Sequence, residues 1–152
     1  MDNKKKMIEG VIITPLKQIE DENGKVMHML RNDSKVFKQF GEIYFSVVNP
    51  KAIKAWRKHK EMFLNYACIE GNIKVVLYDD RKDSKTFGEI EEIELGNKNY
   101  NLITIPPMIW TGFKSEGNQK SIIANCSTIP HSQNEIIRKP ATDKSIPYNW
   151  KI

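Results

Sequence analysis

Short runs of apolar residues, often alternating with polar ones, are separated by turn residues along the whole chain. The runs are rich in Ile, Val, Phe and Tyr, residue types that favour β-strands. Gly24 and Gly71 stand between consecutive runs, where glycine supplies the positive φ that tight hairpin turns require. We expect strands over residues 8–16, 25–30, 42–48, 52–57, 63–69, 73–78, 89–95, 102–105 and 121–125.

Helical patterns are confined to two short stretches, near residues 51–60 and 132–138. The run 89–95 contains four glutamates, but its short length and its neighbours favour a strand. Many short strands at a spacing of roughly 8–12 residues predict an all-β fold. We expect an antiparallel sandwich or jelly roll rather than an α/β fold.

The chain has 152 residues, of which 39% are apolar and 28% are charged, enough for one domain with a sizeable core. We expect a mobile basic segment over residues 1–7 and a single domain over residues 8–152. No stretch approaches the roughly 18 apolar residues of a membrane helix, and no apolar run follows the basic start as in a signal peptide. Cys68 and Cys126 form no C-x-x-C motif, which argues against a disulfide framework and favours a cytoplasmic protein.

Lysine and arginine outnumber aspartate and glutamate by 24 to 19, which gives a net charge of +5. The densest basic group lies within residues 51–60, whereas acidic residues interrupt the basic stretches further along the chain. Nucleic-acid binding requires Lys and Arg clustered over one face, and this scattered pattern does not predict it. The basic group at residues 51–60 instead suits a smaller partner that carries phosphate.

Two segments carry specific motifs. Residues 79–88 follow the pattern D-x-R-x-x-S-x-T-x-G, and residues 105–113 begin with Ile-Pro-Pro and end with Thr-Gly-Phe. In these motifs the chain resembles the nucleotide-sugar 3,5-epimerases of the dTDP-4-dehydrorhamnose epimerase family, and the resemblance extends over residues 8–150. It implies a cupin-type jelly-roll β-barrel, a homodimer, and a nucleotide-diphosphate sugar as the bound partner.

The polar residues of the first motif also have a direct physical interpretation. Asp79 and Arg81 can form an ion pair, and the hydroxyls of Ser84 and Thr86 can bond to the backbone of a turn. We therefore expect these four residues to hold a turn rather than to take part in catalysis.

Proton abstraction beside a ketone needs a base, an electrophile for the enolate and an acid on the opposite face. The resemblance implies that a His, a Lys and a Tyr fill these roles in the family, with further His and Arg side chains around them. Most of the corresponding positions hold other residues here. Arg57 replaces the base His, Leu64 the Lys, Thr111 a second His and Asn23 a phosphate-contacting Arg, and residues 128–131 contain no Tyr.

Three residues remain as candidates for acid–base catalysis: His59, Tyr66 and His131. His59 is the preferred base, because the ordinary imidazole pKa of about 6.5 lies near working pH and strand alternation can place it on the same face as Arg57. Tyr66 faces inward if Leu64 does, and is then a proton donor or a core aromatic. The histidines also have plainer interpretations, His59 as a solvated side chain and His131 as part of a loop.

The resemblance also suggests which residues contact the substrate. Lys54 takes the place of a family Arg, and the basic residues beside it suit a pyrophosphate. The predicted substrate-binding residues are Lys54, Arg57, Trp110, Thr111 and Asn23.

The metal-binding pattern of metallo-cupins is largely missing. Those proteins use two histidines in H-x-H, then a glutamate and a distant histidine, which converge on one ion. The corresponding positions are Arg57, His59, Leu64 and Thr111, so one ligand of four is present. We expect neither a bound metal nor a cofactor.

Two functions of different classes remain open. The first is an epimerase or isomerase that acts on a nucleotide-linked 4-keto-6-deoxy sugar by metal-free proton abstraction next to the ketone. The second is a non-catalytic cupin that binds a sugar nucleotide or supports a partner enzyme of sugar-nucleotide biosynthesis. The motifs and the basic group favour the first, and the substituted His, Lys and Tyr positions favour the second. The fold by itself does not decide between them.

Overall fold

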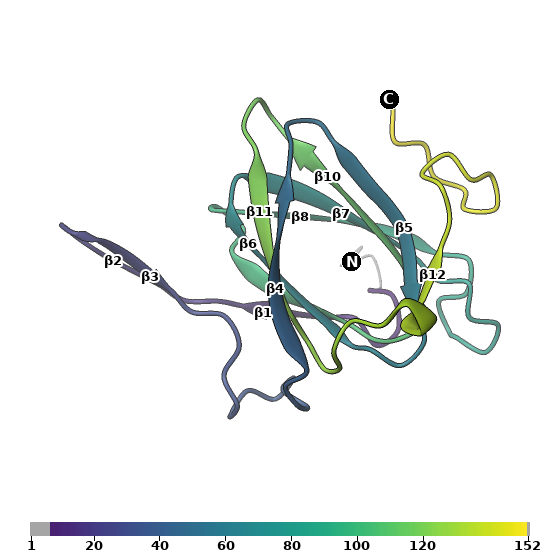
Figure 1. Cartoon of the computed structure of the whole chain (residues 1–152), viewed down its shortest axis with the longest axis horizontal. Helices are drawn as coiled ribbons and strands as arrows, with labels where there is room; N and C mark the ends of the chain where they lie inside the picture. Colours follow the sequence, from purple (N-terminus) through teal and green to yellow (C-terminus); the bar gives the residue numbers. More distant parts are fainter. Residues whose placement is uncertain (1–6, 152) are drawn as a thin grey trace, which may run out of the picture.

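The computed structural model describes residues 7–151 and consists almost entirely of β-strands (Figure 1). A short 3-10 helix, η1 (Gln133–Glu135), is the one helix among these residues. The all-β prediction is confirmed. The strands are β1 (Ile12–Pro15), β2 (Gln18–Asp21), β3 (Gly24–Met27), β4 (Glu42–Val48), β5 (Ile53–His59), β6 (Leu64–Glu70), β7 (Asn72–Tyr78), β8 (Ile90–Gly96), β9 (Asn101–Ile105), β10 (Trp110–Glu116), β11 (Ser121–Ser127) and β12 (Ile136–Arg138).

Two five-stranded antiparallel sheets pack face to face. The first, here called the β4 sheet, has the strand order β1-β9-β6-β11-β4, and the second, the β5 sheet, has the order β12-β5-β10-β7-β8. This arrangement is the predicted cupin-type jelly roll. Within residues 7–151 it is formed by two facing sheets rather than by one closed ring of hydrogen bonds.

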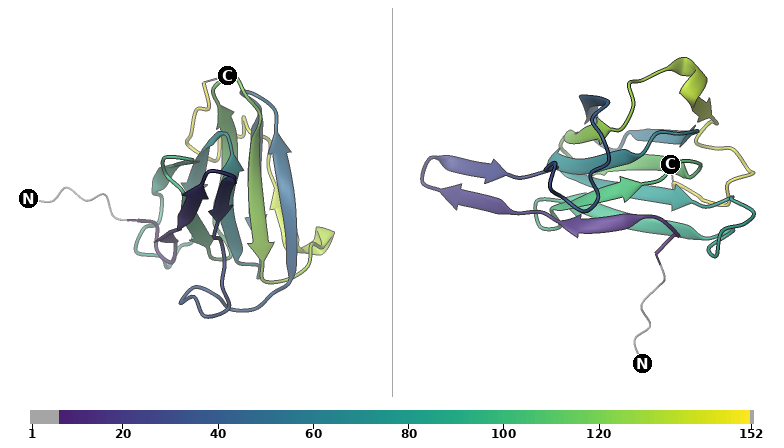
Figure 2. Two further views of the ribbon diagram at one scale, coloured as in Figure 1. Left: turned by 90° about the vertical axis from the view of Figure 1, so that its left-hand side faces the viewer. Right: turned by 90° about the horizontal axis from the view of Figure 1, so that it is seen from below.

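The third sheet is the two-stranded hairpin β2–β3. It projects away from the sandwich, as Figures 1 and 2 both show. Gly24 in this hairpin has a φ of 141°, and Gly71 between β6 and β7 has a φ of 83°. Both turn glycines thus have the positive φ that the sequence predicts.

Alternation along the strands builds the main core between the two sheets. Leu64, Tyr66 and Cys68 of β6 all face this core, as their spacing predicts. The Phe113 ring of β10 meets the Tyr66 ring edge-on, with the ring centroids 5.9 Å apart. Burial of one such large side chain contributes about 1.5–3 kcal/mol, so this layer holds the sheets together.

The C-terminal segment covers the outer face of the β5 sheet. The rings of Trp150 and Trp56 lie 5.2 Å apart, and both belong with Trp110 and Ile146 to a second apolar cluster. Two backbone hydrogen bonds attach this segment to the sheet. The Trp56 N–H donates to the Lys139 carbonyl at 2.8 Å, and the Lys139 N–H donates to the Trp56 carbonyl at 3.1 Å.

The motif at residues 79–88 forms the predicted polar turn between β7 and β8. The Asp79 carboxylate accepts bonds from Arg81 Nε at 2.8 Å, Ser84 Oγ at 2.6 Å and Thr86 Oγ1 at 2.7 Å. Burial by itself would raise the pKa of Asp79, but these hydrogen bonds outweigh it and hold the pKa well below its ordinary value. The motif therefore serves to hold this turn.

Several elements differ from the sequence prediction. Strands β2, β10 and β12 lie outside the predicted ranges, and β1 begins at residue 12 rather than 8. Residues 51–60 carry both a predicted strand (52–57) and a helical pattern, and they contain strand β5, so the strand prediction is confirmed there. Pairing with β10 and β12 overrides the local helical pattern there. The other stretch, 132–138, contains η1 followed by β12.

The predicted mobile segment, residues 1–7, lies outside the described residues except for Met7. Met7 is partly buried and packs against the main core. In the described range 7–151, no helix has the length and apolar character needed to cross a membrane.

Replacing Trp150 by Ala should lower the free energy of unfolding by about 3–5 kcal/mol, because the side chain is 2% exposed and its removal leaves a cavity over Trp56. Chemical denaturation of the two proteins measures this difference. Lys144→Ala, an exposed position in the same segment, is the control and should change stability by less than about 0.5 kcal/mol. A loss of unfolding free energy in Trp150→Ala no larger than that in Lys144→Ala would contradict the packing of Trp150 over Trp56.

Candidate functional site

Strand β5 carries three of the predicted site residues, and a register shift decides which way they point. Opposite β10, Lys54 pairs with Phe113 and Arg57 pairs with Thr111, so β5 has one extra residue between these pairs. Paired residues of neighbouring strands lie on the same face, and Phe113 faces the main core. The shift therefore keeps both Lys54 and Arg57 on the inner face.

Beyond this register shift, the residues of β5 alternate between the outer and inner faces of the sheet. Lys58 lies on the outer face, where its Nζ is 4.7 Å from the centre of the Trp110 ring and 2.5 Å from the Asp80 carboxylate. Arg57 and His59 flank Lys58 and point the other way, so they share the inner face.

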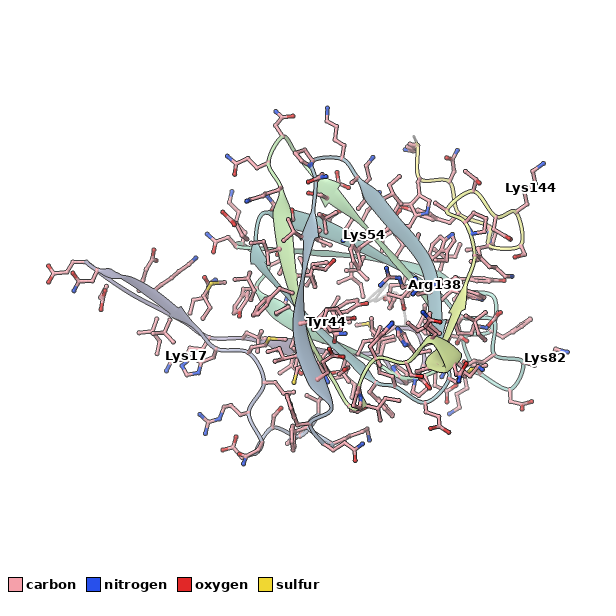
Figure 3. All side chains as sticks on the ribbon, viewed as in Figure 1. Lys17, Tyr44, Lys54, Lys82, Arg138 and Lys144 are labelled. Atoms are coloured by element: carbon pink, nitrogen blue, oxygen red, sulfur yellow. The ribbon has the colours of Figure 1, made fainter. Side chains whose placement is uncertain are left out.

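A small cavity lies between the two sheets beside these residues. Side chains of β4, β5, β6, β10 and β11 contribute to it, and β4 and β5 belong to different sheets. Its lining includes Tyr44, Ser46, Arg57, Tyr66, Phe113 and Asn125. Figure 3 shows Tyr44 on β4 and Lys54 towards β5, on the side of the molecule where these two strands meet. The cavity is thus approached by Tyr44 from one sheet and by Arg57 from the other.

Strand β4 has a polar face towards the interior and an apolar face towards the surface, the reverse of an ordinary core strand. Its apolar residues Ile43, Phe45 and Val47 point outward and are 49%, 63% and 50% exposed. Its polar positions Tyr44 and Ser46 face the cavity. Because β4 is also the edge strand of its sheet, one strand lines the cavity with polar groups and leaves an apolar strip on the surface.

His59 ends β5 and is only 6% exposed. Within residues 7–151, its Nδ1 has no hydrogen-bond partner. Burial lowers the pKa of His59 to about 4; nearby Glu135 opposes this shift, whereas Arg57 and His131 add to it. The imidazole is therefore neutral at pH 7, but its pKa lies well below working pH, so the reason for which the sequence favoured His59 as the base is not met.

Two groups from the segment after β11 lie near His59 and influence its pKa. Glu135 is buried, and its Oε1 accepts two backbone N–H groups just beyond β5, each at 2.7 Å. His131 is exposed, and its backbone N–H donates to the Glu42 carboxylate at 2.9 Å. The predicted His131 therefore lies at the rim of the site, while the unpredicted Glu135 lies inside it.

An open groove of about 430 Å³ adjoins the cavity. Four basic side chains line it: Lys54, Arg57, Arg138 and Lys139. Because Arg57 lines both the groove and the cavity, it stands between them. An anionic group in the groove would meet several cations at once.

Lys54 also joins the two sheets at this edge. Its Nζ donates to Ser46 Oγ at 2.8 Å and to the Val47 carbonyl at 3.0 Å, both on β4. Burial, together with the charge of Arg57, lowers the pKa of Lys54. Figure 3 places Lys54 and Arg138 near each other, in contrast to peripheral lysines such as Lys82.

The other predicted residues occupy different places. Thr111 is buried on the inner face beside Arg57, and Tyr66 lines the cavity. Trp110 is not in the cavity, because it alternates with Thr111 and packs in the outer cluster, where its Nε1 donates to Asp80 at 2.9 Å. Asn23 lies at the turn of the projecting β2–β3 hairpin, away from the cavity of its own chain (Figure 1).

The sequence prediction missed Tyr44, Asn125, Glu135 and Arg138 as site residues. For Tyr44 a signal was present, since residues 42–48 alternate clearly between polar and apolar positions. The signal is easily missed, because the apolar side of an alternating strand is usually taken to be the buried one. Glu135 and Arg138 reach the site because β12 pairs with β5, a contact that the order of the chain does not reveal.

The structure brings together no metal-ligand set in the part of the chain that it describes. No group of three or more His, Cys, Asp or Glu residues in positions 7–151 is arranged to hold a metal ion.

A sequence model of the family described as dTDP-4-dehydrorhamnose 3,5-epimerase matches residues 5–152 of this chain. The chain belongs to the dTDP-4-dehydrorhamnose 3,5-epimerase family. The match covers both sheets, the projecting hairpin and the C-terminal segment, so the whole described fold is that of the epimerase family.

Two proteins of similar sequence support this family membership. The chain is 33% identical over 123 residues, 80% of its length and 79% of the relative's, to the probable low-salt glycan biosynthesis epimerase Agl13 of Haloferax volcanii. It is 31% identical over 146 residues, 95% of its length and 97% of the relative's, to the spore coat polysaccharide biosynthesis protein SpsL of Bacillus subtilis.

Solved structures give the same result. A dTDP sugar isomerase from Desulfovibrio desulfuricans G20 is 46% identical with a TM-score of 0.92, and the alignment covers 94% of this chain and 92% of that one. The 3'-monoepimerase ChmJ of Streptomyces bikiniensis, solved with dTDP-quinovose, shares the fold at 15% identity, with a TM-score of 0.82 and coverage of 93% and 75%.

In this family member, the lowered pKa of His59 should make stability depend on pH. Between the ordinary pKa of about 6.5 and the folded value of about 4, the unfolded chain binds a proton that the folded chain does not. Stability should therefore fall as the pH drops through this window, by about 1–3 kcal/mol more in the wild type than in His59→Gln. Urea denaturation at pH 7 and pH 4 measures the difference. His28→Gln, at a histidine outside this site, is the control and should behave as the wild type.

Proposed function

We propose that this protein is an epimerase or isomerase of a nucleotide-linked 4-keto-6-deoxy sugar and works by metal-free proton abstraction next to the ketone. The observation that carries the proposal is the basic groove beside Arg57, together with the buried, neutral His59 on the same face of β5 as Arg57. Family membership and the names of the relatives support the same reaction class.

The side chains of the site fit this chemistry. Neutral His59 can take the proton from the carbon beside the ketone. The Arg57 guanidinium, always charged, would stabilise the enolate oxygen as negative charge develops there. The phenols of Tyr44 and Tyr66 lie with Arg57 around the small cavity and are the acids nearest to it.

The groove would hold the nucleotide diphosphate. Lys54, Arg138 and Lys139 line it beside Arg57, and charge-assisted bonds to phosphate oxygens are among the strong hydrogen bonds in proteins. The cavity between the sheets has a volume of only about 10 Å³, room for about one water molecule, so the sugar ring would lie in the groove beside Arg57 with its diphosphate further along the groove. Thr111, buried beside Arg57, would contact the sugar end rather than the phosphates.

A non-catalytic cupin that binds the same ligand is the second candidate. One observation favours it: Arg57 occupies the position of the base in the resemblance to the family, and a guanidinium is a poor base. Under this alternative the cavity and groove bind a sugar nucleotide without exchanging its protons.

Solvent exchange decides between the two candidates. A panel of dTDP-, GDP-, CDP- and UDP-linked 4-keto-6-deoxy sugars is incubated with the protein in D₂O, and proton NMR follows the signals at C3 and C5. We expect loss of at least one signal with the wild type and a reduction of about 100-fold or more in His59→Asn, which lacks the base.

His28→Asn, which changes a histidine just after β3 of the projecting hairpin rather than on β5, is the matched control and should exchange at the wild-type rate. Calorimetry with dTDP reports binding separately. Binding without exchange for every sugar in the panel would favour the non-catalytic cupin. An unchanged rate in His59→Asn would remove His59 as the base.

We further propose that the protein is a homodimer in which a second copy covers the outer side of β4. Ile43, Phe45 and Val47 form an exposed apolar strip on an edge strand, an arrangement that proteins normally cover. Ile19 and Val26 of the projecting hairpin are also about half exposed, at 46% and 58%.

Placing a charge on this strip should separate the dimer. Phe45→Lys should sediment as a monomer in analytical ultracentrifugation, because a buried interface would have to accommodate an unpaired ammonium group. Phe87→Lys, at a residue of similar exposure (57%) in the loop before β8, should leave the dimer intact. A monomeric wild type, or a dimeric Phe45→Lys, would rule out this interface.

A cytoplasmic location is also proposed. Cys68 and Cys126 are both buried free thiols, as is usual for proteins of a reducing compartment.

A further inference from the structure

Two lysines of β5, on opposite faces of the sheet, are held by different kinds of partner. Lys58 Nζ lies 2.5 Å from the Asp80 carboxylate, so its charge is compensated within the protein. Lys54 Nζ donates to Ser46 Oγ at 2.8 Å and to the Val47 carbonyl at 3.0 Å, and both of these acceptors are uncharged. Lys54 is therefore fixed in position while its charge stays available to a ligand.

One proton of the Lys54 ammonium group remains for the groove. An ammonium group has three N–H donors, and the two bonds to β4 use two of them. Lys54 lines the groove together with Arg57, Arg138 and Lys139. In the part of the chain that the structure describes, Lys54 forms no ion pair with a carboxylate that would take the third donor. An anion in the groove can thus accept a hydrogen bond from Lys54 while both bonds to β4 stay intact.

The bonds to β4 also hold Lys54 in an environment that disfavours its charge. Burial and the charge of Arg57 both act against the Lys54 ammonium and lower its pKa. The two acceptors on β4 keep the ammonium beside Arg57 in spite of this. Because the lysine side chain is ordered before an anion arrives, binding restricts fewer of its rotamers than it would for a mobile lysine.

Ser46 is the part of this tether that depends on a side chain. The Val47 acceptor is a main-chain carbonyl, which every residue type has. The Ser46 hydroxyl is present because β4 places a polar residue on its inner side. Ser46 lines the small cavity and is not part of the groove lining. A substitution at Ser46 can therefore change the order of Lys54 without removing a side chain of the groove.

We propose that Ser46 is a positioning residue that sets, through Lys54, the affinity of the groove for a diphosphate. The inference rests on the proposed function, in which the groove holds the diphosphate of a sugar nucleotide. Ser46 contacts neither the diphosphate nor the reacting carbon. It acts on binding, because it orients one of the four cations that line the groove.

Two β-branched substitutions of nearly equal size isolate the hydroxyl group. Ser46→Thr keeps the hydroxyl, whereas Ser46→Val replaces it by a methyl group. Isothermal titration calorimetry with inorganic pyrophosphate, and separately with dTDP, measures the affinity. We expect Ser46→Val and Ser46→Ala to bind both ligands about 3- to 10-fold more weakly than the wild type, because each complex then has to order a mobile lysine. Ser46→Thr should bind as the wild type does.

Ser34→Ala is the matched control, at a serine in the loop after β3 and outside the groove lining. It should leave both affinities unchanged. Far-UV circular dichroism checks that each variant is folded. In the D₂O exchange assay, Ser46→Val should raise the substrate concentration at half-maximal rate and leave the maximal rate unchanged, since the diphosphate is bound equally in the ground state and the transition state.

Removal of Lys54 separates positioning from a general structural effect. In a Lys54→Met background the tethered cation is absent, so Ser46→Val should change the affinity for pyrophosphate by less than about 2-fold. An equal loss of affinity in both backgrounds would show that Ser46 acts through packing, and would overturn the proposal.

The remaining outcomes separate this proposal from the proposed reaction. A loss in Ser46→Val that Ser46→Thr does not show, and that requires Lys54, supports the positioning role; if the wild type exchanges no proton of any sugar, only the proposed reaction is overturned. Wild-type affinity in Ser46→Val would overturn the role of Ser46 and leave the proposed reaction standing. A wild type that binds neither pyrophosphate nor dTDP would overturn the groove as a diphosphate site, and the role of Ser46 with it.

Discussion

The β5 sheet must bury apolar groups on both of its faces, one against the β4 sheet and the other against the C-terminal segment. Strand β5 meets this requirement with one extra residue opposite β10, which turns Trp56 towards the outer cluster and keeps Lys54 and Arg57 inside. Without that extra residue, strict alternation would place Lys54 and Arg57 on opposite faces of the sheet, since a shift by one position moves a side chain to the other face. The position of the site therefore depends on how the sheet satisfies its two apolar neighbours.

Strand β4 meets a related constraint at the other side of the cavity. It is an edge strand whose polar residues line the cavity, so its apolar residues are left on the surface. The same alternation thus places Tyr44 at the cavity and Phe45 on the surface of the proposed dimer. A polar cavity between two sheets needs at least one strand with this inverted pattern, because the polar groups have to come from a face that usually forms core.

The electrostatics of the site follow from burial rather than from the number of charges. His59 has basic neighbours in Arg57 and His131, and desolvation is the largest influence on its pKa, so it stays neutral. The net charge of +5 is spread over the molecule, and only the four basic residues of the groove face a common space. Peripheral lysines such as Lys17 and Lys144 lie far from it (Figure 3).

The sequence by itself determined the all-β class, most strand positions, the polar turn around Asp79 and the common face of Leu64, Tyr66 and Cys68. These features follow from local turn chemistry and from the two-residue period of a strand. Only the tertiary structure decided that Trp110 packs outside, that Glu135 and Arg138 join His59 through the β12–β5 pairing, and that Tyr44 faces inward. Alternation tells which residues share a face but not which face is buried, and that choice is made by the elements that pack against the strand.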